Sequence, residues 1–100
     1  MSLDSEACFA ERMEEVGLGA YAGTFKAMGW TTFAKFAYSC AYVPGSGMDE
    51  TGFIREVAEP ILGSLLGVST NRQDLPSVRR LYFEAFTLSA AEMRRNKKRT

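Results

Sequence analysis

The side chains that could carry out chemistry in this chain are carboxylates, basic groups and thiols, because the sequence contains no histidine. Histidine is the commonest general base near neutral pH and the commonest metal ligand. The two cysteines, Cys8 and Cys40, therefore have no histidine with which to form a reactive thiolate pair. Two thiols also fall short of the four ligands that a structural zinc ion normally takes. We therefore expect no catalytic residue, no metal site and no cofactor, and we do not expect an enzyme.

Glycines with some likeness to nucleotide-binding loops occur twice, and neither set has the required context. Gly17, Gly19 and Gly23 are one residue away from the GxGxxG pattern, but no strand-like segment precedes them. The PGSG sequence at 44–47 lacks the Lys and Ser or Thr that follow the last glycine of a phosphate-binding loop. We interpret this second set as a turn-rich surface loop.

Charge is distributed unevenly along a chain whose formal net charge is zero. Residues 1–16 contain five acidic groups and one arginine, whereas residues 79–100 contain seven basic groups and two acidic ones. These opposed ends could attract each other or face separate partners. The candidate partner-binding residues are Glu11, Glu14, Glu15, Arg79, Arg80, Arg94, Arg95, Lys97, Lys98 and Arg99.

The basic run at 94–99 has three interpretations. Its Lys and Arg side chains could neutralise phosphates of a nucleic acid, because counterion release favours such contacts. A short basic cluster is also typical of nuclear-import signals. In the third interpretation the run is a solvated helix end, where cations interact favourably with the negative end of the helix dipole. The sequence leaves these alternatives open.

Helical periodicity dominates the chain, and no segment keeps the alternating pattern of a β-strand. Pro60 predicts either a kink or a break and restart of the helix that contains it. Phe83 and Phe86 could be exposed for a partner, but we favour a wide inward-facing stripe, which is common in core-facing helices. The five expected helices cover about residues 4–16, 18–28, 32–40, 49–62 and 75–95.

Capping residues define several of the expected helix ends. Gly17 follows an apolar helical stripe at a position typical of a left-handed C-cap, and Gly29 is expected to end the second helix. Residues 16–38, which include both glycines, form the stretch on which the rest of the core is expected to pack. Within this stretch Met28 is expected on the inward face beside Phe25. The expected N-caps are Ser2 or Asp4, Thr31 or Thr32, Asp49 and Asp74.

These patterns together predict an all-α protein. We expect a compact orthogonal bundle of about five helices with a long C-terminal helix, in one domain over residues 1–95. Residues 96–100 would form a basic tail or the start of a linker. The side chains expected to be mainly structural are Leu18, Tyr21, Phe25, Trp30, Phe33, Phe36, Tyr82 and Phe86.

The run GLGAYAGTFKAMG at 17–29 resembles the early part of a sterile alpha motif (SAM) domain. In that family a similar GL–Y–F–G pattern joins the first helices of a five-helix bundle. The resemblance covers about residues 9–37, and the long last helix is similar as well. Where SAM domains usually continue with a short "dL–lGI" segment, this chain has the PGSG loop and the helix containing Pro60. The resemblance implies a non-catalytic module for self-association or hetero-association.

We therefore interpret the chain as a protein–protein interaction or oligomerisation module, an adaptor within a longer protein. The alternative is a nucleic-acid-binding accessory domain that uses the basic C-terminal helix and tail. No apolar run approaches the roughly 20 residues of a membrane span, so no membrane contact is expected. The start lacks the features of a signal peptide, and the two cysteines fit reduced thiols. We expect an intracellular location, cytoplasmic or nuclear.

Overall fold

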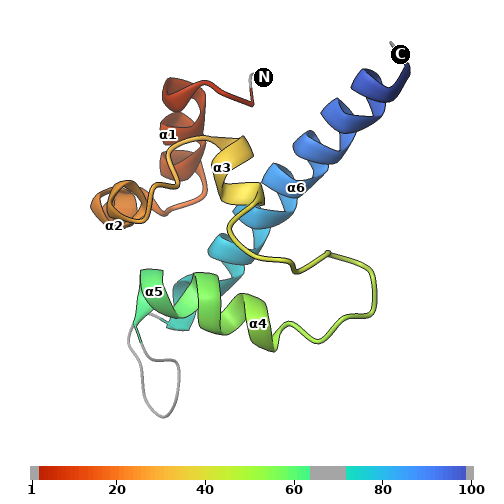
Figure 1. Cartoon of the computed structure of the whole chain (residues 1–100). Coiled ribbons are helices and arrows are strands. Elements are labelled where there is room, and N and C mark those ends of the chain that lie inside the picture. The colour runs from red at the N-terminus through yellow and green to blue at the C-terminus, as the bar shows by residue number, and fades with distance from the viewer. Residues whose placement is uncertain (1–2, 64–71, 99–100) are drawn as a thin grey trace.

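The computed structural model describes residues 3–63 and 72–98, with side chains described over 3–63 and 73–93 (Figure 1). Every regular element in these ranges is helical, and they contain no β-strand. This confirms the predicted all-α fold with a long C-terminal helix. The α-helices are α1 (Glu6–Glu15), α2 (Ala22–Ala27), α3 (Phe33–Ala37), α4 (Thr51–Phe53), α5 (Glu59–Leu62) and α6 (Leu75–Lys98). Two 3-10 turns, η1 (Gly19–Tyr21) and η3 (Arg72–Asp74), and one π turn, η2 (Ile54–Ala58), connect or extend them.

The glycines after α1 and α2 both have left-handed backbone, with φ of 86° at Gly17, as predicted, and 82° at Gly29, which ends the second helix as expected. After α1, the Leu18 amide donates to the Met13 carbonyl at 2.8 Å. After α2, the amide of Trp30 donates in the same way to the carbonyl of the residue five positions earlier, at 2.9 Å. Both ends are Schellman motifs, in which the residue after the glycine turns back onto the helix. Leu18 and Trp30 consequently enter the core.

The helix predicted over residues 18–28 is divided into the 3-10 turn η1 and the short helix α2. A 3-10 turn advances about 120° per residue and an α-helix about 100°, so one uniform spacing does not describe both. The expectation for Met28 was wrong: three residues of α-helix place it about 60° around the axis from the buried Phe25, and its side chain is 44% exposed. Phe25 is buried as predicted, and Tyr21 is half-buried.

The segment with Pro60 is continuous from Thr51 to Leu62, because a π turn precedes the proline. The amide of Glu59 donates to the carbonyl of Ile54, five residues earlier. A proline inside an α-helix crowds the carbonyl four residues before it, and the wider π turn relieves that crowding. The sequence predicted that Pro60 would kink or interrupt this helix, but it did not predict a π turn.

The expected N-caps have different outcomes. The Asp49 carboxylate accepts the Thr51 amide at 2.8 Å, although Glu50 is the N-cap residue of α4. Asp74 lies in η3 directly before α6.

The first helix begins later than expected, because the Ser5 hydroxyl accepts the Cys8 amide at 3.1 Å and caps α1. The Thr32 hydroxyl caps α3 by accepting the Lys35 amide at 3.2 Å, as predicted. Ser2, the other expected first cap, lies outside the described residues.

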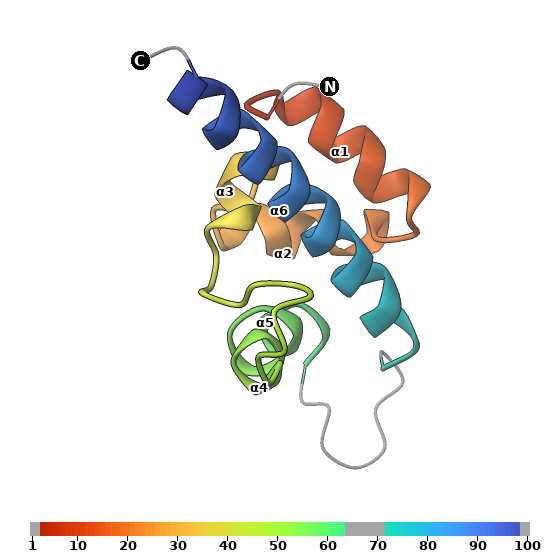
Figure 2. The same ribbon diagram turned by 90° about the vertical axis from the view of Figure 1, so that its right-hand side faces the viewer.

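The core is a cluster of aromatic rings that α6 joins to the rest of the bundle. Phe9 of α1 meets Phe33 of α3 edge to face, with ring centroids 5.0 Å apart. Phe36 meets Tyr82 of α6 in the same way at 5.7 Å, and Phe53 lies 5.0 Å from Tyr82 on the opposite side. Tyr82 therefore connects the N-terminal helices to the α4–α5 segment. Figure 2 shows α1 alongside α6, with α4 and α5 beside the first turns of α6.

Candidate functional site

The predicted basic contact residues have different surroundings. Arg79 is used within the chain, because its guanidinium donates two hydrogen bonds to the Glu50 carboxylate, at 2.6 and 3.1 Å. Arg80 is exposed, with its Nε 3.8 Å from a carboxylate oxygen of Glu84. The backbone of residues 94–98 continues α6 past the expected helix end near residue 95. The side chains of Arg94, Arg95, Lys97 and Lys98, and all of Arg99, lie outside the described residues.

The three predicted acidic contact residues are all exposed on α1. Glu15 lies 3.7 Å from the guanidinium of Arg12, measured from Oε2 to Nη1. The Glu14 carboxylate lies against Gly19, in the space that a side chain would occupy there. Glu11 completes this acidic surface. The structure thus places Glu11, Glu14 and Glu15 on the exposed surface of α1.

A pair of opposite charges that sequence reasoning missed joins α1 to α6. Arg12 donates from Nε to Oε2 of Glu84 at 2.8 Å and from Nη2 to Oε1 at 2.5 Å. The hydrogen bonds from Arg12 lower the pKa of Glu84, and partial burial opposes that effect. The same pairing raises the pKa of Arg12. The charge signs are the reverse of the overall polarity, since the acidic segment supplies the cation and the basic helix supplies the anion.

A groove of about 460 Å³ opens beside this ion pair, between α1 and α6. Its apolar part is formed by Phe83, which is 38% exposed, and by the half-buried Leu88. A smaller depression next to it shares two lining residues with the groove and adds Arg80. We call this surface the α1–α6 face, formed by Arg12, Glu15, Arg80, Phe83, Glu84 and Leu88.

The α1–α6 face combines apolar and charged side chains. An exposed aromatic ring lies among fixed charges of both signs, and Arg12 and Glu84 already satisfy each other. The sequence named Phe83 as either core or exposed, and favoured the core. Its exposure shows that the inward stripe of α6 is narrower than we expected on this flank.

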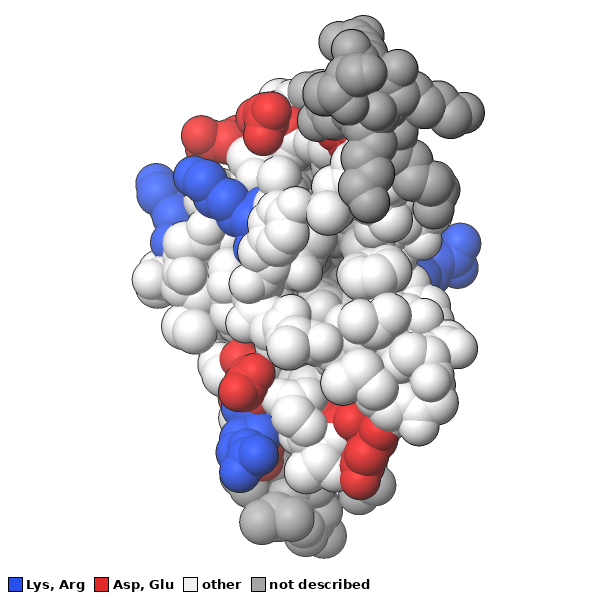
Figure 3. All heavy atoms as spheres, turned by 45° about the vertical axis from the view of Figure 1, so that its right-hand side comes forward, with Lys and Arg blue, Asp and Glu red and all other residues white. Residues whose placement is uncertain are grey.

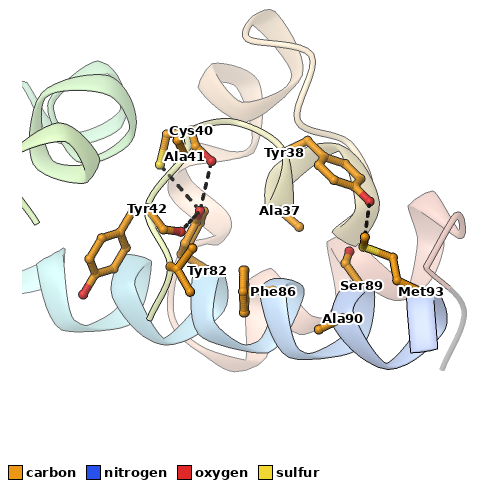
Figure 4. A pocket seen from close by; sticks show the side chains of 11 residues that line it. Ala37, Tyr38, Cys40, Ala41, Tyr42, Tyr82, Phe86, Ser89, Ala90 and Met93 are labelled. Carbon is orange, nitrogen blue, oxygen red and sulfur yellow. Dashed lines mark hydrogen bonds between the residues drawn. The ribbon is translucent and has the colours of Figure 1, made fainter. Parts of the chain in front are cut away.

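A second groove, also of about 460 Å³, lies on the other flank of α6 (Figure 4). We call it the α3–α6 groove. The Tyr82 hydroxyl closes one end, where it donates to the Tyr42 carbonyl at 2.7 Å and also lies 3.3 Å from the Cys40 carbonyl. Burial raises the pKa of Tyr82 well above its ordinary value. The residues lining the groove are Ala37, Tyr38, Cys40, Ala41, Tyr42, Val43, Tyr82, Phe86, Ser89, Ala90 and Met93.

The described residues that line the α3–α6 groove are all uncharged. Figure 3, which brings the side with residues 41–50 forward, shows a broad area of uncharged side chains with Lys, Arg, Asp and Glu side chains around it. Cys40 and Cys8 are both free thiols and half-buried, as expected of reduced cysteines. Phe86, which the sequence placed in the core, is half-buried and forms part of the groove wall.

Comparison with known proteins identifies no matching family model, no matching curated protein and no matching solved structure. Among the described residues, no three acidic or thiol side chains lie together in a way that could hold a metal ion. No helix in the same part of the chain is both long enough and apolar enough to cross a membrane.

Proposed function

We propose that this protein is a non-catalytic interaction module that binds another protein, or a second copy of itself, through the α1–α6 face. The observation that supports this most directly is the exposure of Phe83 between charged side chains from two helices. Protein interfaces typically place an aromatic or arginine anchor at the centre of a polar rim. Phe83 supplies the anchor, and Arg12, Arg80 and Glu15 supply the rim.

The acidic side chains of α1 add a long-range component to this contact. Glu11, Glu14 and Glu15 lie on the helix that forms one side of the α1–α6 face. Clustered charge of one sign accelerates encounter with a surface of the opposite sign. The basic end of α6 on a second copy is such a surface, and a head-to-tail contact of this kind can propagate. The SAM-like run at 17–29 supports the same class of function, and an intracellular setting remains our expectation.

The proposal is tested by replacing Phe83 and measuring association. Phe83→Ala removes the anchor, and because the ring is exposed in the monomer the fold should be preserved. We expect the dissociation constant for self-association to rise about tenfold, as for a typical interface anchor. Sedimentation velocity over a concentration series measures the change.

Met28→Ala is the matched control for Phe83→Ala. Met28 is a large apolar side chain of similar exposure, and it does not line the α1–α6 face. It should leave association unchanged. Equal weakening by both variants would assign the effect to general surface hydrophobicity, and a wild-type protein that stays monomeric at every concentration would rule out self-association.

Nucleic-acid binding is a second candidate function, and one observation favours it. The helix α6 continues through Lys98, and its C-terminal turns project beyond the other helices (Figure 1). Four basic residues of the sequence between 94 and 98 belong to these projecting turns. Basic residues along a projecting helix can neutralise phosphates without a binding pocket. Truncation of α6 before these turns separates this candidate from the first.

A further inference from the structure

The Ser89 side chain is buried in the wall of the α3–α6 groove and has no hydrogen-bond partner. The residue is 6% exposed, and its hydroxyl oxygen makes no hydrogen bond. Buried polar groups in folded proteins are nearly always paired, so a hydroxyl without a partner requires an explanation. In Figure 4 the Ser89 side chain points from α6 toward the space between Ala37 and Tyr38.

Two other hydroxyls of the groove, those of Tyr82 and Tyr38, differ from that of Ser89 because each has a partner. Tyr82 donates to the carbonyl of Tyr42 and lies within hydrogen-bonding distance of Cys40. Tyr38, which is exposed at the other end of the groove, lies with its oxygen 3.7 Å from the sulfur of Met93. Among the described residues that line the groove, Ser89 alone has a buried side-chain polar atom without a hydrogen-bond partner.

The size and lining of the groove restrict what could occupy it. Its volume of about 460 Å³ is within the range typical of small-molecule sites. It is roughly three times the volume, about 150 Å³, of an engineered apolar cavity that binds benzene. None of the described residues that line it carries a charge. A charged ligand would lose its hydration without gaining an ion-pair partner there.

We infer that the α3–α6 groove binds a small, uncharged, mainly apolar molecule whose single hydrogen-bonding group pairs with the Ser89 hydroxyl. A medium-length alkyl chain with one terminal hydroxyl has the required polarity and size. Its apolar part would lie against Phe86 and Ala90. Tyr38 and Met93 are exposed at the mouth, and the flexible thioether chain of Met93 can adjust to an entering molecule. This site is independent of the α1–α6 face and of the function proposed for it.

The test compares three probes of equal chain length: 1-octanol, octane and octanoate at pH 7. Titration of the full chain, followed by amide chemical shifts, gives affinity and location together. We expect 1-octanol to bind saturably, with shifts concentrated in residues 37–43 and 82–93. Octanoate should bind at least about tenfold more weakly, because its charge has no partner in the groove.

Ser89→Ala separates the hydrogen bond from the apolar contacts. It should weaken binding of 1-octanol by about threefold to tenfold, the usual range for one hydrogen bond, and leave octane unchanged. The melting temperature without ligand should not fall, since the variant removes an unpaired buried hydroxyl. An unchanged preference for 1-octanol over octane in Ser89→Ala would overturn the assignment of Ser89.

Ala90→Phe fills the groove and tests its location, with Ala27→Phe as the matched control on the exposed surface of α2. Ala90→Phe should abolish saturable binding of 1-octanol, and Ala27→Phe should not. Equal binding to both variants would overturn the site. The site would also be overturned if the wild-type protein bound none of the probes and the Ala90→Phe variant lost self-association. The groove would then be a protein contact.

Discussion

Arg12 and Glu84 form the hydrogen-bonded ion pair that holds α1 against α6, and their energetic contribution can be measured through pH. The hydrogen bonds from Arg12 keep the pKa of Glu84 below its ordinary value of 4.5. Between these two pKa values the unfolded chain binds more protons than the folded one, so stability decreases as pH falls through this interval. The contribution is fully present above about pH 4.5 and is lost below the folded-state pKa.

Glu84→Gln tests this account. At pH 7 we expect it to lower the free energy of unfolding by about 1 kcal/mol, the upper range for partly exposed ion pairs. The difference from wild type should shrink as pH falls below 4.5 and the wild-type carboxylate is protonated. Urea unfolding at neutral pH and at two acidic pH values on either side of the folded-state pKa measures it. Glu11→Gln, on the exposed surface of α1, should show a difference near zero at each pH, and a constant deficit for Glu84→Gln would contradict the titration.

For single residues, the sequence predicted which side chains are exposed better than it predicted which side chains pair with each other. It identified Glu11, Glu14 and Glu15 as exposed acids, and the structure places them so. It did not connect Arg12 with Glu84, because these residues are 72 positions apart and only the approach of two helices brings them together. The sequence also did not show that the Ser89 hydroxyl lacks a partner, because this depends on what surrounds it in three dimensions.

At the scale of helices, glycines at 23 and 29 have opposite roles within seven residues, and substitution separates them. Gly29 has φ of 82°, where any side chain is strained, although no atom lies within 4 Å of the position of an added Cβ. Gly23 is the exposed second residue of α2, and its φ is not positive. No atom lies within 4 Å of an added Cβ there either. Backbone strain therefore decides the effect of a substitution at Gly29, and helix propensity decides it at Gly23.

We expect Gly29→Ala to destabilise the fold by about 1 kcal/mol, the usual cost of left-handed backbone for a residue with a Cβ. Gly23→Ala should stabilise it by about 0.5–1 kcal/mol, because alanine loses less conformational freedom in a helix. Each is the control for the other, since both add one methyl group to an open position. Thermal unfolding should separate the two variants by about 4–8 °C or more. Changes of the same sign would contradict the assignment of the Gly29 turn.

Helix ends were more predictable than helix interiors. Gly17, Gly29 and Thr32 act through local hydrogen bonds that depend on a few neighbouring residues, so their types are sufficient to locate them. The predictions for helix interiors were wrong where a 3-10 or π turn interrupts the α-helix. The 3-10 turn η1 interrupts the helix predicted over residues 18–28, and the π turn before Pro60 had no signal other than the proline itself. A periodicity argument assumes one helical pitch, and these segments have two.

At the scale of the molecule, α6 organises both candidate sites. It has 24 residues, and its buried side packs against α3 and the π turn while its two flanks form walls of separate grooves. The molecule measures 50 × 32 × 20 Å. An α-helix of this length spans about 36 Å, so α6 accounts for most of the long dimension. The sequence predicted the length of this helix but not its two flanks, because the positions of α1 and residues 40–43 decide which side chains remain accessible.

Deleting residues 94–100 tests what the projecting end of α6 does. The deletion removes five positive charges and lies beyond the last buried core residue described, Ser89, so we expect the fold to survive. If the end of α6 docks on the acidic surface of another copy, the deletion and high salt should both weaken self-association. Reversing the charges at Glu11, Glu14 and Glu15 to lysine should then weaken it as well, because the opposed surfaces steer the encounter.

The nucleic-acid alternative predicts a different result from the same deletion. Affinity for duplex DNA should fall, and the slope of log affinity against log salt should decrease by up to about 0.9 for each phosphate that the protein no longer neutralises. We expect the protein-contact outcome, because the net charge of the chain is zero and no aromatic residue interleaves the basic run. Sedimentation across concentrations and salts, beside a DNA titration, distinguishes the two. A strict monomer that binds DNA tightly only when residues 94–100 are present would reverse this choice and assign the end of α6 to phosphate binding.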